Sequence, residues 1–235
     1  MEQTVQTPPM QRLDRRTART RKALREALAA EVMATGDLTR VTVTAVADRA
    51  GITRRTFYSH YRDIPDLVFC VEQEAISDLR TLVHEIAEVT LPELEEAINH
   101  FNPCPRSVEV LQYFQNEGAH LVPLLGNGGD PAFVERIKAM VRDVVEARAL
   151  HGFAPIALQV FDYYLTFVIS AEVGVIVSWL TTGMQESPEI MARMMTALLF
   201  VRPGDLYGRP IDFDIPALAA QAIALQKEAT DVSSL

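Results

Sequence analysis

The sequence predicts an all-α fold, and three observations lead to that prediction. Apolar residues recur three or four positions apart in successive segments, which is the spacing of one face of a helix. No segment shows the sustained alternation of apolar and polar residues that marks a half-buried strand. The helical segments are bounded by Ser, Thr, Asp, Gly or Pro, which are the residues that start and end helices. A chain of 235 residues with 49% hydrophobic residues can also bury a sizeable core.

The first predicted helix spans residues 14–34 and ends at Gly36, after a polar tail of residues 1–12 that we expect to be disordered. Its inner stripe consists of Leu24, Ala27, Leu28 and Val32. Its start is crowded by the basic residues Arg15, Arg16, Arg19, Arg21 and Lys22. Basic residues at a helix start oppose the helix dipole, and this mild cost makes sense if phosphates lie nearby.

Residues 41–63 predict two short helices joined at Gly51. Thr42 suits the N-cap of the first helix, because its hydroxyl can accept an unpaired backbone N–H. Gly51 supplies the positive φ that a tight turn between helices needs. The second helix buries Ile52, Phe57 and Tyr61. Its other faces combine two forked cations with hydroxyls and no acid, a surface that suits a polyanion with readable base edges.

The charge is divided unevenly along the chain. Residues 1–62 hold 12 Lys and Arg against 6 Asp and Glu, a net charge of +6. Residues 63–235 hold 10 against 25, a net charge of −15, so that the whole chain carries −9. A basic module on an acidic body indicates a protein that approaches DNA with one end only.

The remaining helices form one body. Asp63 caps a helix over residues 63–88 that continues from the basic module into the body and provides a natural lever. Further helices are expected over residues 91–101, 107–125, 131–150, 155–182 and 188–200, with a last one from Ile215. The helix over 107–125 should be interrupted or bent around Gly118 and Pro123. The predicted domains are 13–63 and 64–201, followed by an extension over 202–235.

The segment A-G-I-T-R-R-T-F-Y-S-H-Y, residues 50–61, resembles the signature of the TetR family of bacterial transcriptional regulators. It is correctly placed, near the N-terminus and after one amphipathic helix. The resemblance implies a three-helix DNA-binding domain with a helix-turn-helix, followed by a helical ligand-binding and dimerisation domain. The DNA-binding residues assigned on this basis are Thr42, Thr44, Thr53, Arg54, Arg55, Thr56, Tyr58, His60 and Tyr61.

The resemblance also implies separate roles for these residues. Arg54, Arg55 and Thr56 are expected to face base edges. Tyr58, His60 and Thr42 are expected to bond phosphates and fix the register. Thr53 serves better as the cap of the second helix, and Thr44 lies in the first turn of the preceding helix. In one departure, Ile64 stands where many family members carry a Lys that contacts the DNA backbone, and Arg62 is the nearest substitute.

Residues 167–199 resemble the last helix pair of one branch of the family, in which such pairs build a four-helix bundle with a second subunit. Ala171, Gly174 and Ser178 share one helix face, and small residues there let two helix axes approach closely. Together with Val175 they form the predicted interface of a homodimer. Packing inside one subunit is the alternative for the same residues.

The middle helices are expected to hold any effector pocket. The candidate ligand-binding residues are His84, Phe101, Tyr113, Phe114, His120, Tyr164 and Trp179. They would suit a small apolar or aromatic molecule, although core packing is the alternative for each.

Several function classes are excluded by missing motifs. His84-Glu85 is not followed by a second His at metalloprotease spacing, and no G-x-S-x-G is present. Cys70 and Cys104 form no C-x-x-C pair, so we expect no metal, no cofactor and no enzyme activity. The apolar run over residues 165–180 is shorter than the roughly 20 residues of a bilayer span. With no signal peptide, a cytoplasmic protein is predicted.

The leading hypothesis is therefore a homodimeric repressor that a small effector releases from a palindromic operator on double-stranded DNA. The alternative is a DNA-binding adaptor or architectural protein that is controlled by a protein partner without a small ligand.

Overall fold

The computed structural model describes residues 9–149 and 155–199, and within these residues it contains helices and no strands. The helices are α1 (Pro9–Thr35), the 3₁₀ helix η1 (Leu38–Arg40), α2 (Val43–Arg49), α3 (Arg54–Tyr58), α4 (Ile64–Ala87), α5 (Leu91–Asn99), α6 (Ser107–Leu125), α7 (Pro131–Ala149), α8 (Pro155–Thr181) and α9 (Pro188–Leu198). The all-α prediction is confirmed. The predicted helix from Ile215 and the extension over 202–235 lie outside the described residues.

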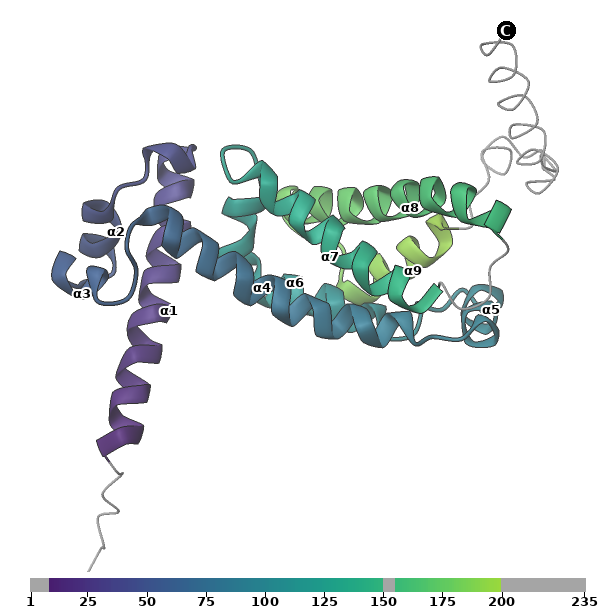
Figure 1. The fold of residues 1–235 in the computed structure, drawn as a ribbon, viewed down its shortest axis with the longest axis horizontal. Helices are drawn as coiled ribbons and strands as arrows, with labels where there is room; N and C mark the ends of the chain where they lie inside the picture. The colour runs from purple at the N-terminus through teal and green to yellow at the C-terminus, as the bar shows by residue number, and fades with distance from the viewer. Residues whose placement is uncertain (1–8, 150–154, 200–235) are drawn as a thin grey trace, which may run out of the picture.

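The helices form a small three-helix end and an elongated body (Figure 1). α2 and α3 lie at one extremity, beside α1, which crosses the long axis of the molecule. α4 leaves this end and runs along the body to α5 at the other extremity, while α8 follows the opposite edge. α1 packs against α6, and α4 packs against α7. The three-helix end is therefore held to the body by side-chain packing as well as by the continuous chain.

Local capping signals set most helix starts where the sequence predicts them. The caps donate or accept as expected: Thr42 accepts from Ala45 N–H at 3.2 Å, Thr53 from Thr56 at 3.1 Å, Asp63 from Asp66 at 2.8 Å and Ser187 from Ile190 at 3.3 Å. Gly36 and Gly51 adopt the positive φ angles +66° and +67°. These bonds satisfy N–H groups that have no partner inside the helix, so the short helices α2 and α3 begin at defined residues.

The structure corrects two local predictions and adds one short helix. α1 begins at Pro9, so residues 9–12 are helical rather than part of a disordered tail, and proline is tolerated in a first helical turn. α6 runs unbroken through Gly118 and Pro123 instead of being interrupted. Gly118 packs closely on the side chain of Met184, since a Cβ there would lie 3.1 Å from the Met184 Cε. η1 was not predicted; Asp37 caps it by accepting from Thr39 N–H at 2.9 Å.

The buried side chains form one continuous core that extends from the three-helix end into the body. The stripe Leu24, Ala27, Leu28 and Val32 is buried as predicted. Val46 and Phe57 complete the core of the three-helix end and are fully buried. Leu67 and Leu79 on α4 carry the same core into the body. Tilting α4 therefore has to disturb packing on both sides of the boundary.

One helix is long and apolar enough to cross a membrane by length and composition alone. It covers residues 162–181 of α8, which makes the apolar stretch longer than the sequence prediction of 165–180. Only 28% of its apolar window is buried in the structure. A single such helix is weak evidence for a membrane span, because helices of soluble proteins pass the same test. Most of its apolar surface is therefore exposed in the single chain.

Candidate nucleic-acid interface

α3 presents its polar side chains outward from a fixed apolar anchor. Phe57 is fully buried and holds the helix on the three-helix core. Its neighbour Tyr58 is 59% exposed, with its ring edge-on to Phe57 at a centroid distance of 5.7 Å. Arg54 and Arg55 are exposed in the first turn, directly after the Thr53 cap. The local sequence therefore orients both guanidinium groups and the tyrosine hydroxyl away from the protein.

The two arginines of α3 differ in their ion pairing from Arg49 and Arg62. Arg49 is engaged by Glu31 at 2.6 Å, and Arg62 by Asp66 at 3.0 Å. Arg54 and Arg55 have no ion-pair partner among the described residues. An unpaired guanidinium keeps all five N–H donors available for guanine or phosphate oxygens.

The threonines of this end divide between capping and free positions. The Thr53 and Thr56 hydroxyls lie 3.0 Å apart, so Thr56 is held against the cap of its own helix. Thr42 uses its oxygen to cap α2, which leaves its hydroxyl hydrogen free to donate. Thr44 is exposed in the first turn of α2. The hydroxyls of Thr42 and Thr44 are therefore both accessible at the start of α2.

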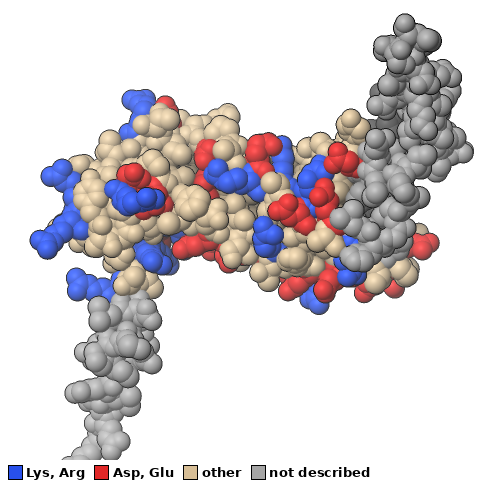
Figure 2. Space-filling view, viewed as in Figure 1, with Lys and Arg blue, Asp and Glu red and all other residues tan. Residues whose placement is uncertain are grey.

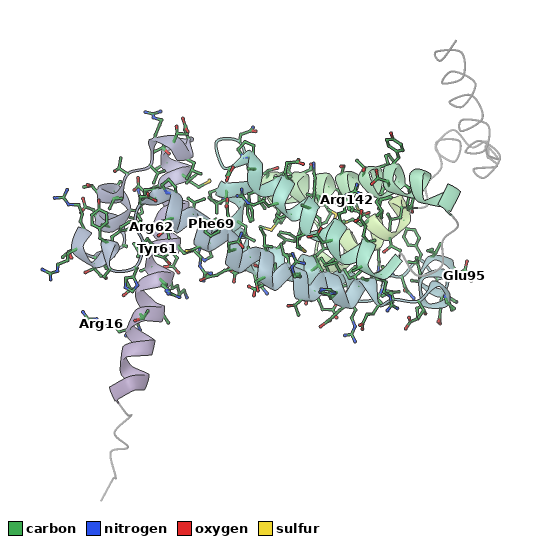
Figure 3. All side chains as sticks on the ribbon, viewed as in Figure 1. Arg16, Tyr61, Arg62, Phe69, Glu95 and Arg142 are labelled. Atoms are coloured by element: carbon green, nitrogen blue, oxygen red, sulfur yellow. The ribbon has the colours of Figure 1, made fainter. Side chains whose placement is uncertain are left out.

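The assignment of Tyr61 to the DNA-binding set is corrected by the structure. Its side chain is only 6% exposed and belongs to the core, and burial raises the pKa of its hydroxyl. Its ring lies on the body side of α3, near the start of α4 (Figure 3). His60, which lies beside it at a ring distance of 6.3 Å, is half-buried and still reaches the surface.

Arg62 does not simply replace the lysine that is missing at position 64. Both its backbone N–H and its guanidinium donate to the carboxylate of Asp66, at 2.8 and 3.0 Å. Ile64 itself is 8% exposed and packs in the core, so this position has no room for a solvated cation. The lysine of the family pattern is therefore absent here, and the nearby guanidinium of Arg62 is engaged by Asp66.

The distribution of charge on the surface follows the division in the sequence. Figure 2 shows Lys and Arg side chains projecting from the end that carries α2 and α3, with few acidic atoms beside them. Along the body, acidic and basic side chains alternate. The field of the molecule thus favours a polyanion at the three-helix end.

The predicted ligand-binding residues are not brought together into one site. Phe114 and Trp179 are buried in the core, and Trp179 Nε1 donates to the Glu186 carbonyl at 3.1 Å. His84, Phe101 and Tyr164 are exposed at separate places. Tyr113 and His120 are half-buried on α6, and burial lowers the pKa of His120. The surface has a hollow of about 250 Å³ between α7 and α8 and another of about 360 Å³ near the start of α4, and neither is lined by these residues.

The predicted dimer residues do share one exposed face. Ala171, Gly174 and Ser178 are exposed on α8, while Val175 is half-buried beside them. Tyr164 and Phe167 extend the same face towards the start of the helix at the same spacing of three and four residues. The sequence analysis missed the exposed apolar residues of α9 that could enlarge it. They are Ile190, Met194 and Leu198, with exposed fractions of 52%, 41% and 50%.

No cluster of three or more His, Cys, Asp or Glu side chains suited to a metal ion occurs in the described parts of the chain. Cys70 and Cys104 are both free and half-buried. The site is therefore described by its cations, hydroxyls and aromatic rings.

Comparison with known proteins matches the two halves of the chain separately. The family described as bacterial regulatory proteins, tetR family, matches residues 27–69. A family described as a transcriptional regulator C-terminal region matches residues 102–200. An uncharacterized HTH-type transcriptional regulator, YxbF of Bacillus subtilis (strain 168), is 25% identical over 195 residues, which make up 81% of this chain and 47% of that protein. The chain thus spans about half the length of this curated relative.

Two solved structures are also similar. A TetR transcriptional regulator from Streptococcus agalactiae 2603V has 22% identity and a TM-score of 0.49, over 81% of this chain and 98% of the other. The fatty acid degradation regulator FadR from Bacillus halodurans has 12% identity and a TM-score of 0.49, over 83% and 96%.

The first family match contains α2, α3 and the start of α4, and the second contains α6 to α9. Arg54, Arg55 and the Thr53 cap of α3 lie inside the first of these matches. Since its N-terminal part matches the tetR family and its C-terminal part matches a transcriptional regulator C-terminal region, the chain belongs to the TetR family.

Proposed function

We propose that this regulator is a homodimeric repressor that reads a palindromic operator and leaves it when a small apolar or aromatic effector binds. The observation that carries the proposal is that one chain exposes both a cationic surface and an apolar surface. Free arginines lie on α3, and an exposed apolar stripe lies on α8. Each surface lacks a partner of complementary chemistry, DNA for the first and a second copy of the chain for the second.

The readout we propose at the DNA end separates base contacts from phosphate contacts. Arg54 and Arg55 each suit a bidentate bond to guanine, whereas Tyr58 and His60 suit phosphate oxygens. Thr56 lies between these groups on the same short helix. Thr42 and Thr44 at the start of α2 would anchor the neighbouring phosphates and thereby set the register of the recognition helix.

The dimer we propose follows from the stripe on α8. Tyr163 and Phe167 are 78% and 71% exposed, which is costly for large apolar side chains in water. Ala171, Gly174 and Ser178 continue the face with small side chains, so two copies of α8 can approach closely. A two-fold dimer places two α3 helices on half-sites about 34–36 Å apart, one turn of the DNA helix.

The effector switch rests on α4, which joins the two parts of the molecule. A ligand that favours one position of the body helices would shift α4 and with it the spacing of the recognition helices. The competing proposal of a protein-controlled adaptor draws on a specific observation, since the predicted ligand residues line neither of the two hollows described above.

Selection of bound duplexes from a random DNA pool, at a stated salt concentration, tests the proposal first. An enriched inverted repeat with half-sites one helical turn apart is expected. Binding that depends on salt but enriches no sequence would contradict the operator reader. The selected repeat then serves as the probe for effectors: release by a small apolar molecule supports the repressor, and release by a protein partner alone supports the adaptor.

A further inference from the structure

The glycine-rich loop between α6 and α7, residues 126–130, touches the three-helix end directly. It lies beside the end of α1 (Figure 1), where Leu38 N–H donates to the Gly128 carbonyl at 2.7 Å. Gly128 has a φ of +87°, and a Cβ at this position would lie 2.0 Å from the Gly36 carbonyl oxygen. The two backbones therefore meet at a distance that only glycine at position 128 permits.

Both partners in this contact are turns that are held by hydrogen bonds to their own helices. At the end of α1, Gly36 N–H donates to the Val32 carbonyl at 2.8 Å. In the loop, Asp130 N–H donates to the Leu124 carbonyl at 2.9 Å. Gly129 packs on the same turn, since a Cβ there would lie 2.1 Å from the Leu124 carbonyl oxygen. Because each turn is fixed to its helix, a contact between the turns also sets the position of α1 relative to α6.

Side chains fasten the same loop to α4. Asp130, the last residue of the loop, accepts from Arg136 Nη2 at 2.9 Å, and this nitrogen also donates to Glu72 Oε2 on α4. Glu72 is 1% exposed, so water and salt screen this bridge less than a surface ion pair. The loop is thus joined both to η1 and to α4, the two segments through which the three-helix end meets the body.

We propose that the backbone contact between Leu38 and Gly128 is a latch that fixes the orientation of the three-helix end on the body. Through this orientation, the latch determines which spacing of operator half-sites the regulator accepts. The inference rests on the dimer and the palindromic operator proposed above, and it adds a determinant of specificity outside the DNA-binding surface. Leu38 and Gly128 are positioning residues, because they act on DNA only through the placement of α3.

The geometry of DNA explains why orientation controls spacing. In a two-fold dimer, the angle between each three-helix end and its body sets the separation of the two α3 helices. One base pair added between the half-sites moves the second by about 3.4 Å and turns it by about 35° around the duplex. A latched end cannot follow this movement, whereas a loosened end can turn with the DNA. Reading of a single half-site does not depend on the latch.

Binding of the selected operator with altered spacers tests the proposal. The spacers are one base pair shorter, unchanged or one base pair longer, and a duplex with a single half-site is measured beside them at one salt concentration. The unaltered full chain should prefer the selected spacing over both neighbours by about tenfold. In Gly128→Ala this preference should fall to about threefold or less, with unchanged affinity for the single half-site.

Two further variants make the test specific. Leu38→Pro removes the N–H donor, and proline suits the first position of a helix, so this variant should show the same loss of spacing preference. It tests the latch even if Gly128→Ala disturbs the folding of the loop. Asn127→Ala is the matched control, because Asn127 is exposed in the same loop, and it should keep the full preference.

Hydrogen exchange at Leu38 N–H, measured without DNA, examines the contact itself. Exchange should be faster in Gly128→Ala than in the unaltered chain and unchanged in Asn127→Ala. Unchanged exchange in Gly128→Ala would refute the latch as a contact, and faster exchange with full spacing preference would refute its role in specificity. An unaltered chain that binds all three spacers equally would contradict the proposed dimeric reader as well. The exchange data keep these failures apart, because they require neither an operator nor a dimer.

Discussion

The DNA-binding end and the α8 face are both surfaces without a partner in the single chain, but they are built in opposite ways. At the DNA-binding end, short helices are fixed by their own caps and present free cations. On α8, a 27-residue helix presents bare apolar side chains to solvent. The first surface is specified within some twenty residues of sequence, whereas the second makes sense only when a partner covers it. Substitutions on the two surfaces should therefore have different effects. Changes on α8 should alter dimerisation, and changes at the DNA-binding end should alter DNA affinity or local helix stability.

The largest expected effect comes from placing a charge on the α8 stripe. Phe167→Asp should weaken dimerisation by about 100-fold or more, because it buries a carboxylate where an aromatic ring is expected to pack. Affinity for a two-half-site operator should fall with it. Sedimentation velocity over a range of concentrations measures the change. Phe101→Asp, the same substitution at a 65% exposed ring outside the stripe, should leave the oligomeric state unchanged.

Equal sedimentation of Phe167→Asp, Phe101→Asp and the unaltered chain would contradict the proposed dimer. That outcome would mean that α8 is covered by something other than a second copy.

Carboxylates give a second contrast between the two regions. At the DNA-binding end, hydrogen bonds from Thr39 lower the pKa of Asp37. In the body, burial raises the pKa of Glu72 to about 7 despite the nearby guanidinium of Arg136, and burial raises that of Glu172 to about 7. The unfolded chain releases these two protons near the ordinary glutamate pKa of 4.5, before the folded chain does. Stability should therefore be greatest at low pH within this window and decline as the pH rises to about 7.

This decline should amount to about 2.5 kcal/mol for each of the two glutamates between pH 5 and pH 8. Urea denaturation at several pH values measures it. Glu72→Gln and Glu172→Gln should each remove the contribution of that glutamate to the loss of stability between pH 5 and pH 8. The double variant should remove both contributions. A profile that keeps its full slope in the double variant would show that other groups control the pH dependence.

The sequence predicted the helices well because the signals that bound them are local. Asp63, Ser187 and Gly51 act on backbone groups within a few residues, so their effect does not depend on tertiary structure. The exposure of Arg54 and Arg55 was predictable for the same reason, while their DNA contacts stay a prediction. For Tyr61 the sequence led to two conflicting predictions, burial from its helical spacing and a DNA-binding role from the family motif, and the structure agrees with burial.

Contacts between distant segments could not be predicted in this way. The hollow near the start of α4 combines η1, α4 and α7, which are separated by dozens of residues. The sequence did contain one signal. Glu72 lies on the same helix face as the apolar residues at positions 68, 71, 75 and 79. A buried acid is normally paired, so this position predicts a buried basic or hydrogen-bonding partner. The partner Arg136 lies 64 residues away, so the helical periodicity of α4 could not identify it.

At the DNA-binding end, base readers and phosphate clamps should be distinguishable. Arg55→Ala should relax the preference for the correct base by about 1–3 kcal/mol, because a bidentate contact is lost. Tyr58→Phe removes only a hydroxyl and should weaken binding to all sequences about equally, by roughly 0.5–1.5 kcal/mol. Binding of the selected operator and of single-base mismatches, measured at one salt concentration, separates the two effects. Uniform loss of affinity in both variants would refute this division of roles.

The smallest expected effect concerns the caps, and it tests directly whether the DNA-binding end is specified locally. Thr42→Val keeps the shape of the side chain but removes the oxygen that accepts from Ala45 N–H at 3.2 Å, and should cost about 1 kcal/mol of stability. Thr44→Val is the matched control, because Thr44 is exposed two residues later and caps no helix. Its effect should stay within about 0.5 kcal/mol. Urea denaturation of the two variants measures the difference. If both variants lost the same stability, α2 would be held by packing on α1 rather than by its own cap. The DNA-binding end and the α8 face would then differ only in the charge of their exposed side chains.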